Sequence, residues 1–165
     1  MLNIRILPDP VLRQKARRVA KIDSSTQKLI DDMIDTMRAA NGVGLAANQV
    51  GILQKVVVIE IPDEDEVRVL INPEVTRREG EREVDEGCLS IPGYRGELTR
   101  SVKVRVRALD RLGKTVRIKA EGLLAQVLEH ETDHINGILY IDHLQNPDHL
   151  WRLNPQEVVG AEDKN

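Results

Sequence analysis

Residues 102–137 read VKVRVRALDRLGKTVRIKAEGLLAQVLEHETDHING, and this stretch decides the fold class. Its first half alternates apolar and charged residues on both sides of a turn at residues 110–113, which is typical of a β-hairpin with one buried face. Its second half has apolar residues at helical spacing from about Leu123 to Asn136, and Gly137 is a common helix terminator. The stretch therefore predicts a hairpin that leads into a helix, with the charged stripe of the hairpin as its solvent-exposed face.

The rest of the chain adds one helix and more strands. The predicted elements are a helix over residues 24–41 capped by Ser24 or Ser25, a strand over 55–61, and a strand over 67–75 broken at Pro73. Segment 43–51, rich in Gly and Ala, is expected to remain outside any packed element. Strands and helices do not alternate as in βαβ units. We therefore predict an α+β fold in which antiparallel or mixed β-strands pack around a central helix.

Length and composition limit the possible functions. The 165 residues predict a single domain over residues 1–165, with residues 145–165 as a partly flexible tail. Aromatic residues make up 2% of the chain, which leaves no row of rings for stacking nucleobases. The net charge of −3 gives no general attraction to nucleic acid or to an anionic membrane. Apolar runs are too short to span a bilayer.

The N-terminus and the cysteine content predict the compartment. The first residues, MLNIRILPDPVL, contain no basic region followed by an apolar block, so we expect no signal peptide. Cys88 is the only cysteine and cannot form an internal disulfide, which agrees with a reducing environment. We therefore expect a cytoplasmic protein.

The predicted helix carries a metal-binding pattern. His130 and His134 are four residues apart and therefore share one helix face, where both imidazoles can reach one ion. Glu131 follows His130 and can reach a water on that ion without binding the ion itself. This His-Glu-x-x-His arrangement is typical of zinc proteases, in which the carboxylate serves as the general base.

The third ligand decides which enzyme class the pattern belongs to. One protease class has a histidine where this chain has Tyr140, and His143 is out of register. Another class uses a downstream glutamate, for which Glu157 and Glu162 in the tail are the candidates. Upstream, Cys88 lies in VDEGCLSIPG, whose Gly and Pro residues predict an exposed loop rather than a core strand. A thiolate there could complete a Cys-His-His site with one open position.

Three segments together resemble the peptide deformylase family. They are GVGLAANQ at residues 42–49, EGCLS at 86–90 and HETDH at 130–134. Their order and spacing also match the family, so the resemblance extends from residue 1 to about residue 145. The resemblance implies these roles: Cys88, His130 and His134 as metal ligands, Glu131 as general acid and base, Gln49 and the Leu89 N–H as oxyanion donors, Gly44 and Gly87 as backbone contacts to the peptide, and Val43 and Val127 as candidates for the methionine pocket.

The resemblance also implies a reaction and its participants. The enzyme would hydrolyse the formyl group from N-formylmethionyl nascent polypeptides and release formate. It would use one divalent metal ion, Fe(II), which zinc, nickel or cobalt can replace. Transient ribosome association is expected, whereas membrane binding and sequence-specific nucleic-acid binding are not. The alternatives are a zinc endopeptidase with Glu157 as third ligand and a metal-binding module without enzymatic activity.

Overall fold

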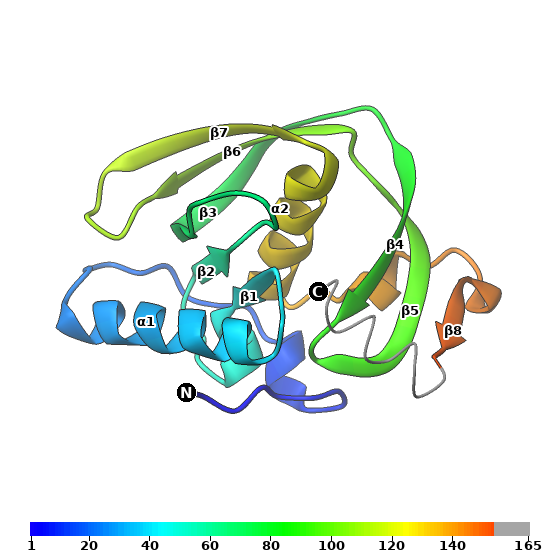
Figure 1. Ribbon diagram of the computed structural model, residues 1–165, viewed down its shortest axis with the longest axis horizontal. Coiled ribbons are helices and arrows are strands. Elements are labelled where there is room, and N and C mark those ends of the chain that lie inside the picture. Colours follow the sequence, from blue (N-terminus) through cyan, green and yellow to red (C-terminus); the bar gives the residue numbers. More distant parts are fainter. Residues whose placement is uncertain (154–165) are drawn as a thin grey trace.

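The computed structural model of the chain describes residues 1–153, which form two β-sheets and two α-helices (Figure 1). The five-stranded sheet has the order β1-β2-β3-β6-β7 and comprises β1 (Gly44–Ala46), β2 (Val56–Ile59), β3 (Arg68–Glu79), β6 (Lys103–Leu109) and β7 (Thr115–Glu121). The three-stranded sheet has the order β4-β5-β8 and comprises β4 (Arg82–Cys88), β5 (Ile91–Arg100) and β8 (Leu150–Arg152). Neighbouring strands pair antiparallel in both sheets. The predicted α+β class with antiparallel strands is confirmed.

The two α-helices pack against opposite faces of the five-stranded sheet. The helical elements are α1 (Ser24–Ala39), α2 (Gly122–Ile135) and the short 3-10 helices η1 (Pro10–Arg13), η2 (Ala47–Val50), η3 (Tyr140–His143) and η4 (Pro147–His149). One apolar cluster contains Leu128 of α2 together with Val57 and Val106 of the sheet. A second cluster contains Met33 and Met37 of α1 with Val56 and Val58 of the same sheet. Because residues alternate along β2, its two faces bury different helices.

The hairpin predicted at residues 102–120 is present as β6 and β7. Val106 pairs with Ile118, and the side chains of β6 alternate between buried and exposed. Lys103, Arg105 and Arg107 are on the exposed face. The predicted helix follows directly as α2, which ends at Ile135, and Gly137 adopts a left-handed φ of 75°.

The structure corrects three details of the sequence-based elements. Asp23, not Ser24 or Ser25, caps α1, because its carboxylate accepts from the Thr26 N–H at 3.1 Å. Strand β3 continues through Pro73, where the register shifts between Ile71 and Glu74, since a bulge tolerates the missing N–H. The segment 43–50 is packed rather than loose, and all of its residues are buried.

Small side chains explain the burial of segment 43–50. A Cβ at Gly44 would lie 2.9 Å from Cγ1 of Val127 on α2, so only glycine lets β1 approach the helix this closely. Ala46 and Ala47 are likewise fully buried. The Gly- and Ala-rich composition therefore indicates close backbone packing here, not the absence of it.

The end of the described chain adds to the three-stranded sheet. Residues 147–152 form η4 and β8, and Trp151 of β8 pairs with Arg95 of β5. The remainder of the predicted tail, residues 154–165, lies outside the described residues, and so do Glu157 and Glu162. Among the described helices, none combines the length and apolarity needed to cross a bilayer.

Candidate metal centre and active site

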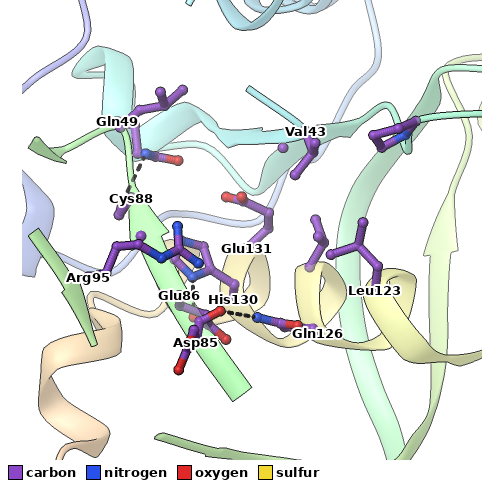
Figure 2. A pocket seen from close by; sticks show the side chains of 15 residues that line it. Val43, Gln49, Asp85, Glu86, Cys88, Arg95, Leu123, Gln126, His130 and Glu131 are labelled. Atoms are coloured by element: carbon purple, nitrogen blue, oxygen red, sulfur yellow. Dashed lines mark hydrogen bonds and ion pairs between the residues drawn. The ribbon is translucent and has the colours of Figure 1, made fainter. Parts of the chain in front are cut away.

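A cleft of about 350 Å³ opens between α2, β1 and the end of β4 (Figure 2). Every residue to which the family resemblance assigns a role lines this cleft except His134, which lies next to Cys88. The lining residues predicted in advance are Val43, Gly44, Gln49, Gly87, Cys88, Leu89, Val127, His130 and Glu131. The three sequence segments therefore come together around one cavity.

Three potential metal ligands meet at the base of the cleft. The Nε2 atom of His134 lies 3.3 Å from Sγ of Cys88 and 3.1 Å from Nε2 of His130. All three donor atoms lie within 4.8 Å of one another. His130 and His134 come from successive turns of α2, whereas Cys88 comes from β4.

The spacing of these donor atoms suits a tetrahedral metal ion. Bonds of about 2.0–2.1 Å from two imidazole nitrogens to such an ion put the nitrogens about 3.3 Å apart. The observed 3.1 Å separation of the two Nε2 atoms is close to this value. Burial lowers the pKa of His134, so its imidazole is neutral and offers a lone pair. The donor set and its geometry therefore fit a divalent metal with one open position.

The position of Cys88 differs from the expected exposed loop. Cys88 is the last residue of β4 and is 3% exposed. Directly after it, Leu89 and Ser90 form the turn into β5. The Gly and Pro residues nearby mark this tight turn, and the thiol itself points inward to His134. The Cys88 thiol is therefore buried and still lies where it could bind a metal ion together with His134.

Glu131 projects from α2 into the cleft beside the donor set (Figure 2). Its Oε1 atom is buried and has no hydrogen-bond partner among the described residues. Burial raises the pKa of Glu131 to about 7, and the negative charge of Glu86 adds to this effect. A carboxyl group with a pKa near 7 can both accept and donate a proton at neutral pH.

Gln49 faces the donor set from the opposite wall, in η2 (Figure 2). Its Oε1 accepts from the Ala46 N–H at 3.0 Å, which fixes the orientation of the amide. Its Nε2 donates to Oγ of Ser90 at 3.1 Å and has a longer contact of 3.6 Å with Sγ of Cys88. The amide is therefore held with its Nε2 group beside the thiol of Cys88.

The turn after β4 is held by the N-terminal segment. The Leu7 N–H donates to the carbonyl of Ser90 at 2.9 Å, and the Arg5 N–H donates to the carbonyl of Gln49 at 2.7 Å. The N–H of Leu89, in the same turn, meets no acceptor within the described part of the chain. A free N–H at the edge of the cleft is available to a ligand.

Known proteins are similar to this chain in sequence and in structure. Residues 1–149 match the family model described as polypeptide deformylase. The peptide deformylase of Dehalococcoides mccartyi strain CBDB1 is 57% identical over 94% of this chain and 93% of its own length. The chain belongs to the peptide deformylase family. A peptide deformylase structure from Legionella pneumophila has a TM-score of 0.85 and 45% identity, covering 99% of this chain and 92% of its own.

A second solved deformylase structure is also similar to this chain. The peptide deformylase of Synechococcus elongatus in complex with actinonin has a TM-score of 0.86 and 39% identity, covering 99% of this chain and 87% of its own. As a deformylase family member, the chain is a metal-dependent hydrolase. Two imidazoles and a thiolate can bind several different divalent ions.

Sequence reasoning missed several residues that surround the deformylase cleft. Glu86 was quoted within EGCLS without a role, yet its Oε1 atom lies 2.7 Å from Nδ1 of His130. Arg95 and Leu123 line the cleft but belong to no recognised motif. Arg100 donates to Glu86 from the far end of β5. A histidine ligand implies a partner for its second nitrogen, and this rule could have directed attention to Glu86.

Proposed function

We propose that the chain removes the formyl group from the N-terminus of N-formylmethionyl nascent polypeptides and releases formate. The single observation that carries this proposal is the Cys88-His130-His134 donor set beside the Glu131 carboxyl group. Family membership supplies the reaction, and the cleft supplies residues for each of its steps.

The metal ion would be held by Sγ of Cys88 and the Nε2 atoms of His130 and His134. When bound, such an ion lowers the pKa of water and polarises a carbonyl oxygen. Fe(II) is our proposal for the native ion, with zinc, nickel or cobalt as replacements. The mixed thiolate and imidazole set supports this range of ions.

Glu131 moves the proton in both halves of the reaction. Its carboxylate accepts a proton from the attacking water and then delivers it to the leaving amine of methionine. Both transfers are feasible because the pKa of Glu131 is near 7 and its Oε1 atom is free within the described residues. Its neighbour Gly44 leaves room for the carboxyl group.

Two donors meet the negative charge that develops on the formyl oxygen. The side-chain amide of Gln49 is pre-oriented because its Oε1 accepts from Ala46 and its Nε2 donates to Ser90, and the N–H of Leu89 is available at the turn. Donors that are already aligned need no reorganisation when the charge appears, which makes them effective stabilisers.

The peptide itself would bind as an added strand. Among the described residues, strands β1 and β4 are terminal in their sheets, so each has an edge without a strand partner there, and Gly44 and Gly87 of these strands line the cleft. Val43 and Val127 line the same cavity together with Leu123. These apolar side chains would form the pocket for the unbranched methionine side chain.

The rival functions receive less support. An endopeptidase with Glu157 as third ligand would leave Cys88 without a role, although its Sγ lies 3.3 Å from His134. A metal-binding module would need neither Glu131 nor Gln49. We therefore favour deformylation over both alternatives.

Further features complete the proposal. Residues 1–165 form one catalytic domain, with α2 as the central helix that organises the site. Nascent chains as substrate imply transient ribosome association in the cytoplasm, where the buried thiol of Cys88 stays reduced. We propose no membrane binding and no sequence-specific nucleic-acid binding.

The direct test uses purified protein and a formyl-Met-Ala-Ser peptide. We expect formate and a new primary amine to appear in equal amounts, and a metal chelator to stop both. The Cys88→Ala variant serves as the control and should release neither product. Formate release that survives both chelation and the Cys88→Ala substitution would contradict the proposal.

A further inference from the structure

Arg100 is a buried cation that none of the proposed catalytic steps uses. It is the last residue of β5, and its side chain is 3% exposed. Its Nε donates to Oε2 of Glu86 at 2.6 Å, and its Nη2 donates to Oε1 of Glu86 at 2.8 Å. Its Nη1 donates to Oδ2 of Asp133 at 2.8 Å. One guanidinium group therefore binds two carboxylates through three nitrogens.

Each of these carboxylates adjoins a proposed metal ligand. Glu86 precedes Cys88 by two residues on β4, and its Oε1 also lies 2.7 Å from Nδ1 of His130. Asp133 directly precedes His134 on α2. Arg100 thus joins the strand that carries the thiol to the helix that carries both imidazoles.

This connection matters because β4 and α2 have little direct backbone contact. β4 packs against β5 and η3, whereas α2 packs against the five-stranded sheet. Near the start of α2, the two elements are bridged by Arg82, whose Nη2 donates to the carbonyl of Gly122 at 2.7 Å. Near the histidines, Gln126 donates to the carbonyl of Asp85 at 3.1 Å and His130 contacts Glu86 directly. Arg100 adds a further bridge there, because it binds Glu86 of β4 and Asp133 of α2 together.

The cluster also sets the orientation of one imidazole. With its Nδ1–H donated to Glu86, His130 keeps the lone pair of Nε2 directed at His134 and Cys88. The guanidinium of Arg100 contacts both oxygens of Glu86, so the carboxylate cannot rotate away from His130. By contrast, Nδ1 of His134 has no partner among the described residues.

Fold stability alone is a weak explanation for this cluster. Buried ion pairs often contribute little net stability, because desolvation of the charges offsets their attraction. Glu86 is 4% exposed, so its charge is almost completely removed from water and the desolvation cost is large. A role in which geometry matters accounts better for three short bonds to one guanidinium.

We propose that Arg100 is a positioning residue of the metal centre, which clamps Glu86 against His130 and ties β4 to α2 so that Cys88, His130 and His134 stay at binding distance. The inference rests on the proposed ligand set but not on the formyl substrate. Its test therefore measures metal binding, and the result is readable whether or not the protein deformylates peptides.

The first experiment measures zinc affinity by titrating the zinc-loaded protein with a chromophoric chelator. Arg100→Lys keeps the positive charge but loses the planar guanidinium that binds both oxygens of Glu86. The zinc affinity should therefore fall about 10- to 100-fold, as for other partners of metal ligands. Arg78→Lys is the control for replacing an arginine that pairs with a carboxylate of α2. Arg78 donates to Oε2 of Glu129, another buried carboxylate of α2, at 3.0 Å and contacts no ligand. The zinc affinity of this control should stay at the wild-type value.

The second experiment separates positioning from general stability. If Arg100 acts through Glu86, the loss in Arg100→Lys should be much smaller when it is measured in a Glu86→Gln background. The absorption bands of the cobalt-substituted protein should also change in Arg100→Lys and remain as in the wild type in Arg78→Lys. If Arg100→Lys does not fold, the isosteric variants Glu86→Gln and Asp133→Asn carry the test and should both weaken zinc binding.

Two results would overturn the proposal. One is wild-type zinc affinity with unchanged cobalt bands in Arg100→Lys or, should that variant not fold, in both isosteric variants. The other concerns the double variant of Arg100→Lys and Glu86→Gln. If its fold-loss of zinc affinity equals the product of the two single losses, the two effects are independent, and Arg100 does not act through Glu86.

Discussion

Gly44 and Glu131 are in such close contact that a Cβ atom on the glycine would lie 2.6 Å from Oε2 of the carboxylate. The two residues come from β1 and α2, and the same Cβ would also lie 2.9 Å from Cγ1 of Val127. The absence of a side chain at position 44 therefore creates the space that the proposed acid and base occupies.

Replacing Gly44 with alanine should impair turnover without removing the metal. The new methyl group must displace the Glu131 carboxyl group or push β1 away from α2. A misplacement of about 1 Å can cost on the order of 10²-fold in rate, and we expect a loss of that order. Steady-state kinetics together with metal analysis would check this. Wild-type turnover in Gly44→Ala would show that the contact is not needed.

Glu131→Gln should retain the metal and lose most activity. The amide has nearly the same shape as the carboxyl group but cannot accept the proton of the attacking water. General acid–base catalysis contributes about 10²- to 10⁴-fold, and one group serving two steps can exceed this. Metal content should match the wild type in the same preparation. Near-native turnover would exclude Glu131 as the acid and base.

Gln49→Ala should fold, bind metal and turn over on the order of 10²- to 10³-fold more slowly, as when an oxyanion donor is removed. Ser90→Ala is an informative companion, because Ser90 accepts from Nε2 of Gln49 and only orients it. Its effect on turnover should be smaller. An increase in KM alone in Gln49→Ala would instead mark Gln49 as a peptide-binding residue.

Cys88→Ala should lose the metal, since it removes one of three donors and leaves two imidazoles. Metal analysis of protein purified without oxygen measures this directly, and thermal unfolding of the same samples reports whether the fold persists. Full metal content and full activity in this variant would show that the third ligand is another residue.

Oxygen sensitivity should depend on the loaded ion. If the native ion is Fe(II), activity should decay in air and persist under nitrogen, and nickel substitution should remove the decay. Equal decay of the iron and nickel forms would indicate unfolding or aggregation rather than oxidation at the metal.

Local patterns in the sequence predict the elements that carry the site. The alternation in β6 and β7 and the helical spacing in α2 are strong local signals, and α2 alone brings His130, Glu131 and His134 together. Cys88 became a candidate because its segment was expected to be an exposed loop, and the family resemblance then gave it the role of metal ligand. Its burial was missed because Gly and Pro residues mark both exposed loops and the tight turn that follows β4.

Long-range pairing explains what the sequence does not reveal. Arg100 lies 14 residues from Glu86 and 33 residues from Asp133, and no periodicity links these positions. Likewise, segment 43–50 is buried because it packs against α2, which lies more than 70 residues later in the sequence. Such contacts follow from how elements far apart in the sequence pack against one another, which local propensities do not specify.

The most direct test of the account offers one Met-Ala-Ser peptide in formyl, acetyl and unblocked forms and follows formate, acetate and internal cleavage together. Besides its oxygen and nitrogen, a formyl carbon bears only a hydrogen, so it can approach an ion crowded by Cys88, His130 and His134. An acetyl or peptide carbonyl carbon bears a larger carbon substituent in place of that hydrogen. A missing methylene alone gives about 10- to 200-fold discrimination, and a clash at the reacting carbon should give at least that factor. We therefore predict rapid formate release, little acetate and no internal cleavage. Internal cleavage that is faster than formate release would make the chain a protease and would contradict the account.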